Sequence, residues 1–319
     1  MERRTLGSVG EVSVLTLGGG GLGQVWGPTT RQEAVATVRE AVDAGIDLID
    51  VAPGYGDGEA ERVVGEAFAG KLPAGVRVST KCGLGNPDPF DVPAFLEKSL
   101  DDSLTRMRIS FADVFLLHNH VTAEAEPGAP WATPVSLFVE AVRPALEDLV
   151  RRGRIGSWGI TAVADTAAVT EVLGAAPTPA AAQCVANLLD SAGELAPAQS
   201  DTRPAETLAA ARRHGVGVMG IRAVQAGALT YGIDRELPPE HPIMADFHRA
   251  EPFRALAREF GESAASLAHR YALSMPEVDT VVLGVKDRAE LRECVAAAAA
   301  GRLRPDEMAT IRAAVGSGG

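Results

Sequence analysis

Lysine, cysteine and aromatic residues are scarce in this chain of 319 residues. It contains only four lysines, and aromatic residues make up 5% of it. The three cysteines, Cys82, Cys184 and Cys294, are an odd number, lie far apart and form no C-x-x-C pair. This usage argues against a disulfide framework or a zinc ribbon, and it favours a reducing compartment such as the cytoplasm.

Positive charge is also in deficit. Thirty Lys and Arg residues stand against 42 Asp and Glu residues, which gives a formal net charge of −12. We therefore expect no nucleic-acid or membrane partner, because nucleic acids and anionic membranes both require a basic surface. The sequence has no apolar run long enough to span a membrane and no apolar signal-peptide core after Met1. With 46% hydrophobic and 23% charged residues, the composition is that of a folded globular protein.

A helix that ends at a glycine and is followed at once by a short apolar strand recurs along the chain. The first such helix begins at the capping box Thr30-Arg31-Gln32-Glu33 and ends at Gly45. Eight buried strands are predicted, at residues 14–17, 46–51, 76–80, 112–117, 155–160, 181–185, 216–221 and 280–283. Apolar strands that alternate with helices form a parallel sheet, and eight such units predict a (β/α)8 TIM barrel of the α/β class. No linker divides residues 1–319, so we expect a single domain, with an N-terminal β-hairpin at residues 3–12 that caps the barrel bottom.

The glycine-rich segment after the first strand, Gly18-x-Gly20-x-x-Gly23, matches the dinucleotide-binding pattern of Rossmann folds. In that pattern the third glycine lies inside a helix. Here Gly23 is followed by Gln24-Val25-Trp26-Gly27-Pro28, which does not read as a helix. We therefore interpret the segment as a tight loop at the end of a strand.

Polar side chains follow three consecutive predicted strands. Asp50 lies at the carboxyl end of the second strand and Tyr55 just beyond it, while Lys81 follows the third strand and His118 the fourth. The carboxyl ends of barrel strands meet at one face, and barrel enzymes carry their active sites there. We expect these four side chains to converge at that mouth.

The segment Asp50-Val51-Ala52-Pro53-Gly54-Tyr55-Gly56, with Lys81 and His118 at matching spacing, resembles the aldo-keto reductase family. The resemblance covers essentially the whole chain, as far as Leu283-Gly284-Val285-Lys286. It implies an NADPH-dependent oxidoreductase that reduces aldehydes or ketones, or reversibly oxidises sugar or alcohol hydroxyls. Its substrate is then a small carbonyl or sugar molecule, and Asp50, Tyr55, Lys81 and His118 form the catalytic tetrad.

The chemistry of these residue types fits that role. A free tyrosine ionises near pH 10, which is too high for easy proton exchange at neutral pH. The ammonium of Lys81 favours the phenolate of Tyr55, and Asp50 holds and neutralises the lysine. His118 is able to donate a hydrogen bond to the substrate oxygen, while Tyr55 acts as the general acid/base.

The resemblance also implies residues for the nicotinamide half of the cofactor. Gln183 and Thr161 match positions that hold the carboxamide. Ile221 stands where many members have an aromatic residue that stacks on the nicotinamide, so stacking is lost here. Arg222 is expected near the pyrophosphate.

The adenosine half is expected at the start of the last barrel helix. Gly284, Lys286 and Arg288 lie in this segment, and a helix N-terminus with two cations suits the 2′-phosphate of NADPH. Glu290 stands where the family has Gln or Arg. NADH is therefore the alternative cofactor.

Four loop residues are expected to line the substrate pocket: Trp26, Asn119, His120 and Trp131. Many family members have an aromatic residue after the catalytic histidine. Asn119 at that position therefore indicates a more polar pocket.

Three other functions compete with hydride transfer. His118 and His120 share a strand face, as in a barrel metallohydrolase, but no further histidine ends a predicted strand, so no metal is expected. Lys81 is a candidate Schiff-base lysine of an aldolase, although Asp50 would keep it charged. A catalytically weak, cofactor-sensing barrel that binds a partner protein is the third alternative. The complete tetrad favours hydride transfer.

Overall fold

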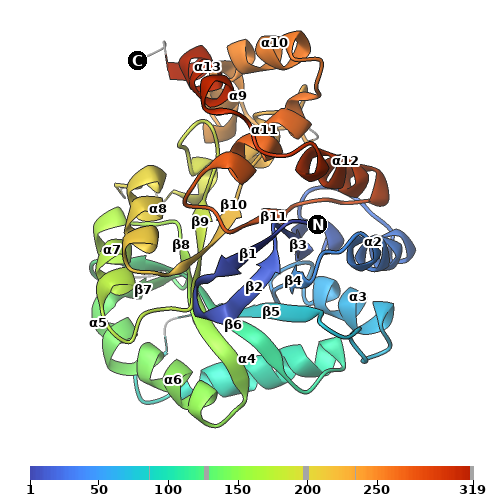
Figure 1. Cartoon of the computed structure of the whole chain (residues 1–319). Coiled ribbons are helices and arrows are strands. Elements are labelled where there is room, and N and C mark those ends of the chain that lie inside the picture. Colours follow the sequence, from blue (N-terminus) through green and yellow to red (C-terminus); the bar gives the residue numbers. More distant parts are fainter. Residues whose placement is uncertain (86, 126–128, 197–200, 234, 317–319) are drawn as a thin grey trace.

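A computed structural model describes residues 1–316 except residues 86, 126–128, 197–200 and 234. Eight parallel strands close into a barrel surrounded by helices, as predicted (Figure 1). The strands are β3 (Leu15–Gly18), β4 (Leu48–Asp50), β5 (Arg77–Cys82), β6 (Ala112–Thr122), β8 (Ile155–Ala162), β9 (Ala181–Val185), β10 (Gly217–Ile221) and β11 (Thr280–Leu283). The barrel is closed because β11 pairs with β3 and β5 pairs with β6.

Helices pack around the barrel and beyond one side of it. The surrounding helices are α2 (Arg31–Asp43), α3 (Glu59–Ala67), α4 (Val92–Met107), α6 (Arg143–Arg151), α7 (Thr166–Gly174), α8 (Pro204–Arg213), α11 (Ala264–Ser274) and α12 (Arg288–Ala299). Helices α9 (Pro242–Arg249), α10 (Glu251–Glu259) and α13 (Pro305–Gly316) lie at one end of the molecule (Figure 1) and share a second apolar cluster with α11. Among the described residues, no helix has the length and apolar character needed to cross a membrane.

The lower part of the barrel interior is apolar. One buried cluster fills it, formed by Leu6, Val12, Leu48, Val114, Leu116, Ala181 and Met219. Leu6 and Val12 come from the N-terminal hairpin of β1 (Arg3–Leu6) and β2 (Gly10–Ser13), which pair antiparallel. The predicted hairpin is therefore confirmed, and its apolar side chains close the barrel bottom.

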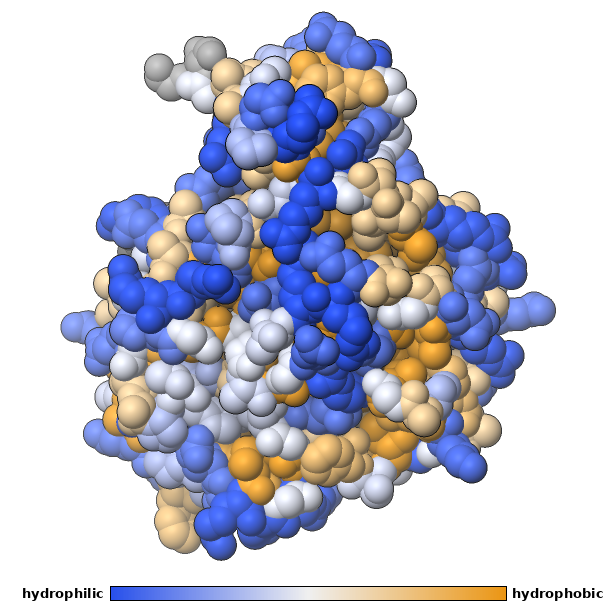
Figure 2. Space-filling model, viewed as in Figure 1, coloured by the Kyte–Doolittle hydropathy of each residue, from blue (hydrophilic) through white to orange (hydrophobic). Residues whose placement is uncertain are grey.

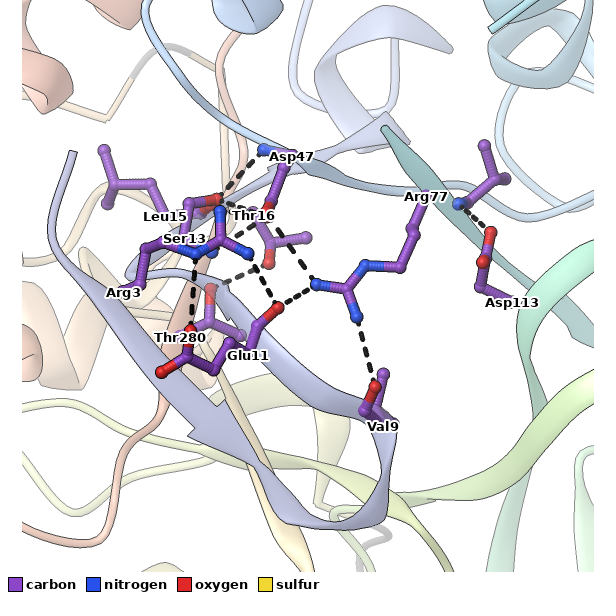
Figure 3. Close-up of polar contacts among 11 residues, drawn as sticks. Arg3, Val9, Glu11, Ser13, Leu15, Thr16, Asp47, Arg77, Asp113 and Thr280 are labelled. Carbon is purple, nitrogen blue, oxygen red and sulfur yellow. Dashed lines mark hydrogen bonds and ion pairs between the residues drawn. The ribbon is translucent and has the colours of Figure 1, made fainter. Parts of the chain in front are cut away.

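Polar contacts fasten this hairpin to the barrel (Figure 3). The carboxylate of Asp47 accepts hydrogen bonds from the backbone N–H of Ser13 at 2.8 Å and from the guanidinium of Arg3 at 2.5 Å. Nη1 of Arg77 donates to the carbonyl of Val9 at 3.1 Å. Hydrophilic residues extend across the centre of this face of the molecule (Figure 2). The hairpin thus has an apolar inner side and a charged outer rim.

Strand β6 is longer than predicted, and its end differs from its neighbours. Leu117 lies opposite Ile160 of β8, and the next pair is His120 with Thr161. Residues 118–119 therefore form a bulge that has no partner on β8. Beyond the bulge, β6 pairs with a short additional parallel strand, β7 (Ala132–Pro134), which was not predicted. Because the bulge adds an even number of residues, the alternation of inward and outward side chains continues through it.

The glycine-rich segment forms one helical turn, α1 (Gly19–Leu22), where the sequence predicted a loop. A Cβ at Gly21 would lie 1.9 Å from the carbonyl oxygen of Val285, and one at Gly18 would lie 2.2 Å from that of Leu283. The segment needs glycine because its backbone packs directly against the end of β11. It is not part of a Rossmann fold.

Candidate active site

The inward-facing side chains change from apolar to polar toward the barrel mouth. Asp50, His118 and Gln183 each lie two residues beyond a member of the apolar interior cluster. Side chains two apart on a strand share a face, so these three point into the barrel one level higher. On β5, Ser79 pairs with Asp50 and Lys81 pairs with Leu116, so both β5 side chains also point into the barrel. The barrel thus has an apolar floor and a polar mouth.

Lys81 is completely buried at this level. Its Nζ donates to Oδ2 of Asp50 at 2.7 Å and to the carbonyl of Val51 at 3.0 Å, and it lies 4.8 Å from the ring centroid of Tyr55. Burial by itself lowers the pKa of Lys81, but the Asp50 carboxylate and the Tyr55 hydroxyl outweigh it, so the pKa lies above its ordinary value. Lys81 is therefore an ammonium held beside Tyr55.

Three side chains donate to the buried carboxylate of Asp50. Ser79 Oγ reaches Oδ1 at 3.0 Å, and both Lys81 Nζ and Gln183 Nε2 reach Oδ2, at 2.7 and 2.8 Å. Gln183, expected to hold the nicotinamide, thus directs its amide nitrogen to the Asp50 carboxylate. Ser79 was not predicted, although its position two residues before Lys81 already places both on one face. Asp50 holds Lys81 in place.

The imidazole of His118 packs edge-to-face against the ring of Tyr55. The rings of Tyr55 and His118 are perpendicular, and their centroids are 5.7 Å apart. Burial, then the positive charge of Lys81 and then His120 lower the pKa of His118 to about 3. It is therefore a neutral imidazole, which has one N–H to donate. The structure brings the four residues of the tetrad together.

His120 and Trp131 lie together just beyond the tetrad. Their ring centroids are 5.3 Å apart, and Trp131 is 43% exposed. The buried Nδ1 of His120 has no hydrogen-bond partner among the described residues. The pair thus offers an aromatic face and this polar atom, and its place in the substrate pocket stays a prediction.

Asn119 does not take the place that the sequence predicted for it. Its Oδ1 accepts a hydrogen bond from the backbone N–H of Leu84 at 2.8 Å, and its Nδ2 donates to the carbonyls of Gly85 and Pro130 at 3.2 Å each. Strand alternation turns it away from His118 and His120, so its amide joins the loops that follow β5 and β6. All of these hydrogen bonds go to backbone groups of the loops, so the amide acts as a structural link in this fold.

Trp26 lies beside residues predicted to bind the cofactor. A Cβ at Gly284 would come within 3.2 Å of its indole nitrogen. The guanidinium carbons of Arg222 and Arg235 lie 5.3 and 5.8 Å from its ring. Its place in the substrate pocket stays a prediction.

Two buried polar atoms belong to residues that were predicted to hold the nicotinamide and the pyrophosphate. Thr161 Oγ1 and Arg222 Nη1 have no hydrogen-bond partner within the described ranges. Arg222 adopts a left-handed backbone conformation, with φ at 62°, and its Nη2 donates to Glu194 at 2.8 Å. Ile221 packs beside it against an apolar cluster that includes Val185. Unsatisfied buried donors and acceptors cost free energy, so the two atoms fit the amide and phosphate groups of a nicotinamide cofactor.

The predicted 2′-phosphate residues are each paired with a glutamate. Lys286 Nζ lies 3.2 Å from Glu290, and the guanidinium of Arg288 makes two hydrogen bonds of 3.0 Å to Glu33. The N–H of Glu33 donates to Thr30 Oγ1 at 3.1 Å, as a capping box predicts. Its carboxylate, however, binds Arg288 of α12. The sequence pattern indicated neither the Glu33–Arg288 pair nor the Glu194–Arg222 pair.

The geometry of the site supports neither a metallohydrolase nor a Schiff-base aldolase. Among the described residues, no group of three or more His, Cys, Asp or Glu side chains is arranged to hold a metal ion. The raised pKa of Lys81, which Asp50 and Tyr55 sustain against burial, keeps it protonated and so unsuited to forming a Schiff base. The metallohydrolase and aldolase alternatives are not favoured.

Comparison with known proteins agrees with this geometry. The model of the Aldo/keto reductase family matches residues 14–315. L-galactose dehydrogenase of Arabidopsis thaliana is 31% identical over 303 residues, which cover 93% of this chain and 88% of that protein. The NADH-specific methylglyoxal reductase of Escherichia coli is 27% identical over 304 residues, covering 87% and 86%. An aldo/keto reductase from Klebsiella pneumoniae, solved with NADP and acetate, superposes with a TM-score of 0.71 at 22% identity, covering 98% and 95%. The chain belongs to the aldo/keto reductase family.

Proposed function

We propose that this protein transfers hydride between NADPH and a small aldehyde or ketone, and that it runs in reverse on sugar or alcohol hydroxyls. One observation carries the proposal: the buried Lys81 ammonium, held by Asp50, lies against the ring of Tyr55, and the neutral His118 lies against the same ring. The names of the relatives include both a sugar dehydrogenase and a carbonyl reductase. Such a pair fits a reversible reaction.

Each residue of the tetrad has a definite task. Tyr55 releases its proton to the substrate oxygen, and Lys81 stabilises the phenolate that remains. Asp50 keeps Lys81 in position. His118 donates its N–H to the same substrate oxygen and stabilises the negative charge that develops there. In the reverse direction the Tyr55 phenolate takes the proton from the hydroxyl.

The cofactor supplies or accepts the hydride when it is bound. Thr161, Gln183 and Ile221 would hold its nicotinamide, and Arg222 would hold its pyrophosphate. The start of α12, with Gly284, Lys286 and Arg288 at its entrance, would bind the ribose that carries the 2′-phosphate, which is why NADPH is proposed over NADH. The substrate would enter beside His120 and Trp131.

The state of the cysteines and the contacts among the proposed catalytic residues are both consistent with this proposal. The three cysteines are buried free thiols, in line with the cytoplasmic location expected from the sequence. The cofactor-sensing alternative is less favoured, because the four proposed catalytic side chains form one connected set. Asp50 binds Lys81, and both Lys81 and His118 lie against the ring of Tyr55.

Replacing Tyr55 by phenylalanine tests the proposal. The variant keeps the ring beside Lys81 and removes the proton, so we expect kcat to fall by about 10² to 10⁴. Oxidation of NADPH is followed at 340 nm with a panel of aldehydes and ketones, and reduction of NADP with sugars. NADPH affinity, measured separately by fluorescence, is expected to stay the same. Tyr231→Phe, which changes an exposed tyrosine, is the matched control. Full turnover in Tyr55→Phe would refute the assigned role.

A further inference from the structure

Every cation assigned to the phosphates of the cofactor is already paired with a glutamate. The pairs are Arg222 with Glu194 (2.8 Å), Lys286 with Glu290 (3.2 Å) and Arg288 with Glu33 (3.0 Å). Each of these three cations therefore has a carboxylate beside it, although Glu194 also lies 3.9 Å from Arg235. At α12, a cofactor phosphate meets cations that are already paired rather than free ones.

Glu290 takes the position of an anion at the N-terminus of α12. Its Oε2 accepts from the backbone N–H of Lys286 at 2.9 Å, while its Oε1 faces Lys286 Nζ. Asp287 caps the helix by accepting from the N–H of Glu290 at 2.9 Å. Phosphates bind helix N-termini through the same kinds of donor. A 2′-phosphate bound there has to compete with the Glu290 carboxylate.

Glu33 holds the second cation from a different helix. Both of its carboxylate oxygens accept from the Arg288 guanidinium, and Oε1 also accepts from the Arg288 backbone N–H at 3.1 Å. The hydrogen bonds from Arg288 lower the pKa of Glu33, so it is ionised at neutral pH. To bind a phosphate, Arg288 must share or give up a two-bond ion pair.

The 2′-phosphate of NADPH carries close to two negative charges at neutral pH, as a phosphate monoester does. NADH has a hydroxyl at that position, and this hydroxyl can donate a hydrogen bond to a carboxylate. The two glutamates therefore disfavour one cofactor and not the other. The pyrophosphate is common to both cofactors, so Glu194 cannot tell them apart.

We infer that Glu290 and Glu33 are specificity-determining residues that weaken binding of the 2′-phosphate and bring NADH within competing range of NADPH. This inference rests on the proposed function, since it concerns the same cofactor site. Glu194, by contrast, weakens both cofactors alike.

Charge-removing variants test the inference by binding alone. Dissociation constants for NADPH and NADH are measured by quenching of tryptophan fluorescence in Glu290→Gln, Glu33→Gln and Glu194→Gln. Glutamine keeps an acceptor oxygen for the Lys286 N–H and removes the charge. We expect Glu290→Gln and Glu33→Gln each to bind NADPH about tenfold more tightly, with NADH changed by less than about twofold. Glu194→Gln is expected to tighten both cofactors by the same factor.

Glu40→Gln is the matched control. Glu40 pairs with Arg292 at 2.5 and 2.9 Å, across the same two helices but farther from the N-terminus of α12. Neither affinity is expected to change in it. Urea unfolding establishes that each variant is folded.

The binding measurements distinguish a failure of the inference about the two glutamates from a failure of the proposed function. If the unmodified protein binds a nicotinamide cofactor but Glu290→Gln and Glu33→Gln leave NADPH unchanged, weaken it, or tighten NADH equally, the inference is wrong and the function stands. If the unmodified protein binds neither cofactor, the proposed function is overturned and the inference with it.

Discussion

At the scale of single residues, the charge state of His118 determines how it can act on a substrate. Burial, Lys81 and His120 lower its pKa to about 3, so it stays neutral between about pH 5 and 8. We expect the NMR signal of its Cε1–H to keep one chemical shift across that range, and kcat/KM to show no inflection from it. The spectrum of His118→Gln identifies the signal. A titration near pH 6.5 would contradict the role of neutral donor.

The tetrad was predictable from the sequence for a simple physical reason. Asp50, Lys81 and His118 lie near the carboxyl ends of their strands, and Tyr55 lies in the loop that follows β4. The strand ends of a barrel meet whatever the intervening helices do.

Partners that come from unrelated elements were not predictable in this way. Glu33 meets an arginine 255 residues away and Glu194 one just beyond another strand, so neither contact appears as a local pattern. The opposite orientation of Asn119 was predictable, because it alternates with His118 and His120 on one strand.

At the scale of elements, Asn119 ties two mouth loops into one wall. Its amide oxygen and nitrogen serve the backbone of Leu84, Gly85 and Pro130. Asn119→Asp keeps the acceptor but turns the donor into an oxygen that faces two carbonyls. We expect it to lower the free energy of unfolding by about 1–3 kcal/mol, measured from urea denaturation midpoints.

Asn119→Asp is also expected to raise KM more than it lowers kcat, because in the proposed function these loops border the substrate site while the tetrad lies deeper in the barrel. Asn187→Asp is a control with another buried asparagine, whose amide donates to Ser191 and Gln225 elsewhere in the fold. Equal stability in Asn119→Asp and the unmodified protein would show that the loops do not depend on this amide.

Most helices and strands followed from local pattern, since periodic apolar residues and terminal glycines mark their lengths. The exceptions depend on contacts distant in sequence. Strand β7 exists because β6 extends past its neighbours and offers it a free edge. The turn α1 exists because glycines there allow close packing on β11. Neither contact leaves a local signal.

At the scale of the whole molecule, net charge affects how the cofactor arrives. The chain carries −12, and NADPH and NADH are both anions, so the long-range field repels them. We expect the association rate constant, measured by stopped-flow fluorescence, to rise as salt is increased from about 10 to 150 mM, because salt screens this repulsion. A fall with salt would mean that the cations near α12 dominate the field despite their paired glutamates.

The two-residue bulge in β6 bears on how a barrel of this kind can be altered. Adding residues in pairs leaves every side chain of a strand on its original side, whereas a single insertion would turn His118 toward the outer helices and bring its neighbour into the barrel. Whether an insertion at this end of β6 adds an even or an odd number of residues thus decides which side chains face the barrel. We therefore expect β6 to accept the gain or loss of a dipeptide at this rim more readily than that of a single residue.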